Sequence, residues 1–196
     1  MSESPLKREA ERIIEELDLL RLLSAYGEAR IVGSVALDLI VKLDIDIHLL
    51  VDNPDTLEVA NGISNSLLTY EIVPEVRITK IPGHGIKIGV DKYPSDSGDW
   101  SIDILVTNNP SSTAFDSVER LRASLTPEQR ETILALKRHY YAEGRLRDGM
   151  SHRIYSAVIE RGVRTMMSSR GSRPEPASRE YFYLGPGNDM RRAPVV

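Results

Sequence analysis

Alternating acidic and branched apolar residues form two short stretches of this chain, Asp44-Ile45-Asp46-Ile47 and Ser101-Ile102-Asp103-Ile104-Leu105. Isoleucine favours β-strands, and successive side chains of a strand point to opposite faces. Asp44 and Asp46 are therefore expected on one face of a strand, with the isoleucines on the other. If the second stretch pairs beside the first, Asp103 joins the acidic face. The two stretches predict a sheet with one apolar face and one carboxylate-bearing face.

Three carboxylates on one patch repel each other and have raised pKa values, and a bound divalent cation keeps such a cluster ionised. Mg²⁺ is the expected cation, because it prefers oxygen ligands and accompanies substrate phosphates. The chain has no cysteine, which excludes disulfides, thiolate metal sites and a cysteine nucleophile. Asp44, Asp46 and Asp103 are thus the candidate metal ligands. The alternative is that they are solvated residues at strand ends.

Gly33-Ser34 stands just ahead of a short helix that we expect over residues 35–40. Backbone N–H groups at a helix start attract anions, and glycine lets a phosphate approach closely. Gly33 and Ser34 are therefore candidate phosphate-binding residues. The alternative is an N-cap serine after a tight turn. His48 continues the parity of the acidic face; it could orient a carboxylate or meet an acceptor, although such a histidine is more often a packed residue.

Hydrophobic periodicity and turn signals indicate an α/β chain. An amphipathic helix is expected over residues 5–25, and Asn53 is the expected N-cap of a helix with Pro54 at its first position and an end near Leu68. The other expected helices are 35–40, 126–144 and 151–161, and the expected strands are 30–32, 44–51, 75–79, 86–90 and 100–107.

Four regions follow from this pattern. Residues 1–27 form an N-terminal helix that packs on the core, and residues 28–108 form an α/β domain that ends at an Asn-Asn-Pro break. Residues 109–165 form a C-terminal helical segment, whose first expected helix begins at a capping box at Thr126. Residues 166–196 are rich in Ser, Arg, Pro, Glu and Gly and are expected to be a flexible tail.

The order Gly-Ser, short helix, Asp-x-Asp and a lone strand-borne Asp resembles the nucleotidyltransferase superfamily with a DNA polymerase β-like palm, over about residues 28–107. The helical segment resembles the C-terminal helices of antibiotic nucleotidyltransferases. Residues 10–165 are similar to small bacterial nucleotidyltransferase-domain proteins without an established substrate, through the runs Gly-Asp-Trp-Ser-Ile-Asp-Ile and Ile-Glu-Arg-Gly-Val-Arg-Thr. The resemblance implies an α+β fold: a mixed, mostly antiparallel twisted sheet with helices on one face, followed by C-terminal helices.

The resemblance also implies a reaction. An acceptor hydroxyl attacks the α-phosphate of a nucleoside triphosphate, and pyrophosphate leaves. Asp44 and Asp46 would bind the Mg²⁺ that bridges the triphosphate, and Asp103 would complete a second metal position or take the acceptor proton. In a two-metal site one cation activates the attacking oxygen and the other stabilises the leaving one.

The resemblance assigns nucleotide contacts to Gly33, Ser34 and Lys137, the last because a lysine on a C-terminal helix meets the triphosphate in small members of the superfamily. Many members also carry a second glycine after Gly-Ser and a serine just before Asp-x-Asp. Here those places hold Asp38 or its neighbours and Leu43. This departure affects the expected nucleotide affinity and base choice more than the metal site.

The implied function is Mg²⁺-dependent transfer of a nucleoside monophosphate, expected to be AMP from ATP, to a hydroxyl of a small molecule. Two alternatives stay open: transfer to tRNA or protein, and nucleotide binding without catalysis. The formal net charge is −4, and the excess of acidic residues lies before residue 164. This acidic body argues against a broad nucleic-acid surface, whereas the arginine-rich C-terminal part argues slightly for tRNA. The chain shows no bilayer-spanning apolar run and no signal-peptide pattern, so we expect a cytoplasmic protein without membrane contact. Leucine-rich residues 13–23 could form a homodimer interface or pack on the sheet.

Overall fold

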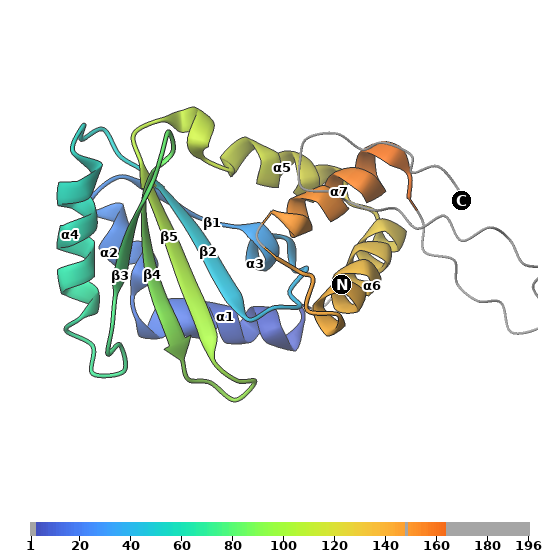
Figure 1. Cartoon of the computed structure of the whole chain (residues 1–196), viewed down its shortest axis with the longest axis horizontal. Coiled ribbons are helices and arrows are strands. Elements are labelled where there is room, and N and C mark those ends of the chain that lie inside the picture. The colour runs from blue at the N-terminus through green and yellow to red at the C-terminus, as the bar shows by residue number, and fades with distance from the viewer. Residues whose placement is uncertain (1–2, 148, 164–196) are drawn as a thin grey trace, which may run out of the picture. The chain divides into compact units, whose positions relative to one another are not determined.

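The chain combines one five-stranded sheet with helices, as its α/β pattern predicts. The structure, a computed structural model, describes residues 3–147 and 149–163 (Figure 1). Its helices are α1 (Pro5–Glu16), α2 (Leu19–Ser24), α3 (Gly33–Leu37), α4 (Thr56–Leu67), α5 (Phe115–Ser124), α6 (Pro127–Ala142) and α7 (Met150–Arg161), with a short 3-10 turn at Pro110–Ser112. Its strands are β1 (Glu28–Val32), β2 (Asp44–Leu50), β3 (Arg77–Ile81), β4 (Gly85–Tyr93) and β5 (Trp100–Thr107).

The sheet has the strand order β1-β2-β5-β4-β3. The β1–β2, β4–β5 and β3–β4 pairs are antiparallel, and only the central β2–β5 pair is parallel. The expected mixed, mostly antiparallel sheet is therefore confirmed. In the parallel pair Asp46 lies opposite Asp103, and in the β4–β5 pair Gly89 lies opposite Asp103. This register places the two Ile-Asp-Ile stretches side by side at the centre of the sheet.

The apolar face of the sheet packs against α1, α2 and α4. Its central residues Ile45, Ile47, Ile102 and Ile104 are at most 1% exposed. They belong to one hydrophobic cluster that also contains the inward-facing residues of α1, α2 and α4. Burying an isoleucine side chain contributes about 1.5–3 kcal/mol, so this cluster is the main source of stability. The expected helices on one face are thus α1, α2 and α4, and the opposite face of the central strands carries the carboxylates.

A second hydrophobic cluster joins α3 to the C-terminal helices. Leu37 and Leu39 from the α3 region pack with Phe115 of α5, Ile133 of α6 and Ile154 of α7. In Figure 1 these three C-terminal helices lie to the right of the sheet, next to α3. The cluster fixes a helical wall beside the carboxylate face. The expected division at residue 108 stays a prediction, and the expected tail, residues 166–196, lies outside the described residues.

The predicted single helix over residues 5–25 is wrong, because the chain breaks it at Asp18. This residue has a left-handed backbone with φ +47°, a conformation that Asp tolerates better than most side chains. Ser4 caps α1, and its hydroxyl accepts a hydrogen bond from the Lys7 N–H at 3.2 Å. Both helices still face the core. Leu17, Leu19 and Leu23 are buried in it, so the leucine-rich stretch packs on the chain's own sheet.

Further expectations also differ from the structure. The helix after β2 is capped by Asp55 rather than Asn53, and it begins at Thr56. The expected half-buried strand 75–79 runs instead over β3, four of whose five residues are exposed, because β3 is an edge strand. Helix α5 was not expected as a separate element. The capping box at Thr126 is confirmed. Among the described residues, no helix has the length and apolar character needed to cross a bilayer.

Candidate active site

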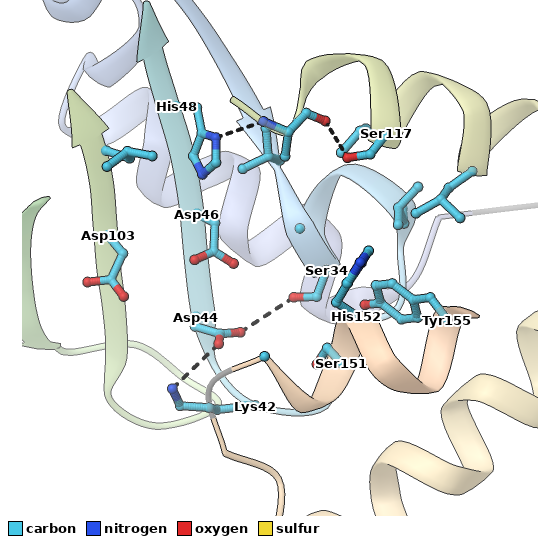
Figure 2. A pocket seen from close by; sticks show the side chains of 18 of the residues that line it. Ser34, Lys42, Asp44, Asp46, His48, Asp103, Ser117, Ser151, His152 and Tyr155 are labelled. Carbon is cyan, nitrogen blue, oxygen red and sulfur yellow. Dashed lines mark hydrogen bonds and ion pairs between the residues drawn. The ribbon is translucent and has the colours of Figure 1, made fainter. Parts of the chain in front are cut away.

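A cavity of about 600 Å³ opens on the carboxylate face of the sheet. Strands β2 and β5 form one wall of it, and residues of α3, α5, α6 and α7 form the others. Figure 2 shows the side chains that line this space. Asp44, Asp46 and Asp103 all lie on the strand wall, so the structure brings together the three carboxylates that the sequence singled out. The volume lies within the range of about 300–1,000 Å³ that is typical of small-molecule sites.

Asp46 has a strongly perturbed environment on this wall. Burial, followed by the charges of Asp44 and Asp103, raises its pKa to about 7. Burial also raises the pKa of Asp44, although Lys42 and Lys137 act in the opposite direction. A raised pKa means that the ionised form of the carboxylate is disfavoured. A cation that binds beside the carboxylate stabilises this ionised form.

Two lysines partly neutralise the acidic face. Lys87 Nζ lies 2.7 Å from the Asp103 carboxylate, and Lys42 Nζ lies 3.5 Å from the Asp44 carboxylate (the latter pair is drawn in Figure 2). Within the described residues, Asp46 has neither an ion pair nor a hydrogen bond of this kind. The carboxylate whose pKa is raised to about 7 is therefore one without a cationic partner at ion-pair distance among the described residues.

Gly33 and Ser34 contact this acidic wall directly. Gly33 has φ +63°, and a Cβ atom on it would come within 2.5 Å of Asp46 Oδ2. Both the backbone angle and the close approach thus require glycine at this position. The Ser34 hydroxyl lies 3.4 Å from Asp44 Oδ1, to which it donates a hydrogen bond, and the residue is buried. The Gly-Ser bend and the Asp-x-Asp strand form one packed unit.

Lys137 is placed at the cavity by α6, but it is only 2% exposed. Its ammonium donates hydrogen bonds to the Leu39 carbonyl at 2.6 Å and to the Tyr155 hydroxyl at 3.3 Å. Burial lowers the pKa of Lys137 to about 8, and the charges of Asp44 and Asp46 offset part of that effect. Lys137 therefore adds a buried positive charge behind the carboxylates.

Several solved structures of other proteins are similar to this chain in fold. The chain aligns with the Cid1 poly(U) polymerase bound to MgATP at a TM-score of 0.58 and 18% identity, over 79% of this chain and 50% of Cid1. It aligns with a protein of the GLD-2/RNP-8 complex at 0.57 and 15%, over 79% and 57% of the two chains. It aligns with the polymerase core of TRAMP, an RNA surveillance complex, at 0.56 and 17%, over 81% and 50%.

The chain has the polymerase β-like nucleotidyltransferase fold. It spans about half the length of the solved structures that it resembles. No protein-family model matches the sequence, and no curated protein matches it. The identities of 15–18% to the three structures make this a likeness of fold.

Within this nucleotidyltransferase fold, His48 has a structural contact. Its Nδ1 atom accepts a hydrogen bond from the Ala114 N–H at 3.0 Å (Figure 2), and burial lowers its pKa. The neutral imidazole connects β2 to the start of α5. His48 also lines the cavity, on the same face as Asp44 and Asp46, as the strand parity predicts.

Several residues that line the cavity were not predicted from sequence. Lys42 and Lys87 contact the carboxylates. Lys87 lies on the polar side of its hairpin strand, as strand parity predicts, but its contact with Asp103 depends on the β4–β5 register, which the local sequence does not specify. Further lining residues come from the end of α5 and from around the start of α7: Leu121, Arg147, Gly149, Ser151 and His152.

The residues of the nucleotidyltransferase fold match a divalent cation in donor chemistry. Asp44 and Asp46 provide carboxylate oxygens, the ligands that Mg²⁺ prefers, and Asp46 carries no protein counter-ion among the described residues. As the side chains stand, no group of three or more His, Cys, Asp or Glu residues in the described part of the chain is arranged to hold a metal ion. The donor set is suitable, but the third carboxylate is occupied by a lysine.

Proposed function

We propose that this chain is a Mg²⁺-dependent nucleotidyltransferase that transfers AMP from ATP to a hydroxyl group of a small molecule and releases pyrophosphate. The observation that carries the proposal is the convergence of Asp44, Asp46 and Asp103 on one wall of a cavity next to the Gly33-Ser34 bend. The fold shared with nucleotidyltransferases, one of them a complex with MgATP, supports it.

In this proposal the carboxylates of β2 and the carboxylate of β5 have different roles. Asp44 and Asp46 on β2 would hold the Mg²⁺ that accompanies the triphosphate, and Asp103 on β5 would hold a second cation or take the acceptor proton. Bound Mg²⁺ would neutralise the triphosphate and stabilise charge on the attacking and leaving oxygens. Because Asp46 and Asp103 are paired in register, both strands present their carboxylates to the same point of the cavity.

The reaction balances as a substitution at the α-phosphorus. The acceptor oxygen forms a bond to that phosphorus, and the bond from phosphorus to the oxygen that bridges to the β-phosphate breaks. The proton of the acceptor hydroxyl passes to Asp103 or to water, and pyrophosphate carries away the electron pair. The protein contributes mainly by positioning the two reactants and by preorganised charge.

The nucleotide contacts of the proposal lie on the helical side of the cavity. Gly33 leaves room for the triphosphate beside Asp46, and Ser34 adds a hydroxyl when it turns from Asp44. Lys137 contributes the positive charge behind the phosphates, because its ammonium is held at the cavity by the Leu39 carbonyl. The proposal thus gives these three residues the role that the family resemblance implies, with Lys137 acting from a buried position.

The acceptor is proposed to be a small molecule, because the cavity is of small-molecule size and the chain is acidic, with a pI of about 5.6. RNA is the second candidate. One similar structure is a cytoplasmic RNA terminal U-transferase, matched at a TM-score of 0.50 and 18% identity, and Cid1 is a poly(U) polymerase. Arg147, Lys42 and Lys87 on the cavity lining are compatible with a phosphate-bearing acceptor.

The test is to incubate the protein with each of the four α-labelled ribonucleoside triphosphates, Mg²⁺, and either a small-metabolite pool or total RNA. Pyrophosphate release together with transfer of label to small solutes supports the proposal, and preference for ATP supports its choice of nucleotide. Label on RNA would establish the second candidate.

The control for the test is a pair of charge-matched variants. Asp103→Asn removes a carboxylate from the cavity wall and should reduce transfer at least about a thousandfold. Asp99→Asn removes an exposed carboxylate outside the cavity and should leave transfer unchanged. Binding of ATP without pyrophosphate release under all these conditions would identify a nucleotide-binding module and reject the enzymatic proposal.

A further inference from the structure

We propose that Lys87 is a resident counter-ion of Asp103, which a second divalent cation must displace before it binds there. The inference rests on the proposed function, and it names a residue that controls the occupancy of the second cation position. Its basis is the contact between the Lys87 ammonium and Asp103 Oδ2 at 2.7 Å, which is both an ion pair and a hydrogen bond.

The contact is well formed but open to solvent. The side chains of Lys87 and Asp103 are 39% and 30% exposed, so ions in solution reach both. Ion pairs that are this exposed to solvent contribute little stability, so a divalent cation can compete with the lysine for the carboxylate. Lys87 can therefore occupy the carboxylate of Asp103 in the absence of a cation and still be displaced when a cation binds.

The three carboxylates differ in their counter-ions. Asp103 has Lys87 at hydrogen-bond distance, Asp44 has Lys42 at 3.5 Å, and Asp46 has no cationic partner among the described residues. An incoming cation therefore meets the least competition at Asp46 and the most at Asp103. A cation therefore binds at Asp103 only when Lys87 leaves it.

The structure also provides room for Lys87 to move. A second cavity of about 160 Å³ extends from Asp103 across β4 and β3, and Lys87, Gly89 and Arg77 line it. Gly89 lies directly opposite Asp103 and has no side chain that would fill this space. Lys87 and Asp103 line both cavities, so the ammonium can turn into the second cavity without leaving the carboxylate face.

The test is a titration of the full chain with Mn²⁺, in the presence of a saturating non-hydrolysable ATP analogue, followed by calorimetry and by the electron paramagnetic resonance signal of free Mn²⁺. We expect the wild-type chain to bind one Mn²⁺ tightly and a second weakly. In Lys87→Met the second dissociation constant should fall at least about fivefold, because the competing charge is gone. The first should change by less than about twofold.

Two further variants separate loss of this ammonium from other effects. Lys80→Met removes an exposed lysine of the adjacent β3, outside both cavities, and should bind both cations as the wild type does. Lys87→Arg keeps a positive charge beside Asp103 and should keep the second cation weakly bound. Far-ultraviolet circular dichroism confirms that each variant is folded, and Lys87→Gln replaces Lys87→Met if the latter is not.

The outcomes distinguish this inference from the proposed function. Equal second dissociation constants in wild type and Lys87→Met would overturn the role of Lys87 and leave the nucleotidyltransferase proposal standing. A single bound Mn²⁺ in both proteins would do the same. If neither protein bound Mn²⁺ or the nucleotide, the proposed function and this inference would both fail.

Discussion

The two faces of the central strands contrast with each other residue by residue. On β2 and β5, Ile45, Ile47, Ile102 and Ile104 are fully buried against helices. Their immediate neighbours Asp44, Asp46 and Asp103 line an open cavity instead. The same backbone therefore supports a stabilising face and a face where like charges are held together against their mutual repulsion.

This contrast shows how the fold tolerates an unfavourable site. Burial and its acidic neighbours raise the pKa of Asp46 to about 7, so this residue does not favour the folded state when it is ionised. The apolar cluster on the reverse of the strands offsets that cost. Substitutions on the two faces should thus have opposite effects: loss of activity without loss of stability on one, and the reverse on the other.

The largest expected effect is on the acidic face. Asp46→Asn should reduce nucleotidyl transfer at least about a thousandfold, because it removes a cation ligand and the charge at the centre of the wall. The melting temperature should stay the same or rise, since a buried repulsive charge is removed. Transfer rate and thermal unfolding, measured on the same preparation, check both parts. Full activity in Asp46→Asn would show that the carboxylate face is not needed for transfer.

The apolar face is tested by Ile104→Ala. Ile104 is 0% exposed, and truncation of such a residue costs about 2–5 kcal/mol of unfolding free energy. Urea denaturation measures this loss. At low temperature, where the variant is folded, transfer per folded molecule should stay within about threefold of wild type, because the side chain points away from the cavity. A variant that is stable but inactive would show that the faces are not independent.

The contrast between the faces was predictable because it depends on strand parity alone. The alternation of Asp and Ile sets which side chains share a face, whatever the strand pairs with. The register of pairing is a different matter. The contact of Lys87 with Asp103 depends on how β4 pairs with β5, including an irregularity between Val90 and Tyr93 that no local sequence signal specifies.

Tertiary contacts also explain the elements that sequence did not give. Helix α5 has Ala114 at its N-cap, which provides no side-chain cap. The Ala114 N–H is instead bound by His48 Nδ1, a residue distant in sequence, so the usual start signal of a helix is missing from the local sequence. In the same way, the sequence pointed to Lys137 as a nucleotide contact, but its burial against Tyr155 and Leu39 depends on tertiary packing that the sequence does not specify.

A carboxylate that stabilises the fold sharpens the comparison with Asp46. Burial tends to raise the pKa of Glu9, but hydrogen bonds from Ser95, Ser97 and the Trp100 indole outweigh it and lower the pKa from 4.5 to about 2. Glu9→Gln should cost about 1 kcal/mol of unfolding free energy at pH 7, because these partly exposed bonds are charge-assisted.

The pH dependence of this cost has a definite sign. A carboxylate with a lowered pKa contributes fully above its unfolded value of 4.5, and that contribution is lost as the pH falls towards 2. Denaturation curves at pH 7, 4.5, 3 and 2 should therefore show wild type and Glu9→Gln converging. Glu15→Gln, an exposed control on the same helix, should change the unfolding free energy at pH 7 by no more than about 0.5 kcal/mol. A constant gap down to pH 2 would contradict the assignment.

The smallest expected effect concerns the helix that covers the apolar face, where the sequence pointed to the wrong cap. Asp55 Oδ1 accepts hydrogen bonds from the Leu57 and Glu58 N–H groups at 3.1 and 3.0 Å. Asn53 accepts one from the Asp55 N–H at 2.8 Å and makes no contact with the helix itself. Asp55→Ala should therefore cost about 1 kcal/mol in urea denaturation, and Asn53→Ala only a few tenths.

The larger loss of unfolding free energy identifies the N-cap of α4, because Asp55 and Asn53 are both exposed, close in sequence and of residue types suited to capping. Asp52→Ala provides the baseline for loss of a nearby charge. If Asn53→Ala were the more damaging variant, α4 would begin two residues earlier than described, with Pro54 at its first position. Because α4 covers the apolar face and does not line the cavity, neither variant should change nucleotidyl transfer, and an effect on activity would mean that the two faces of the sheet are coupled through this helix.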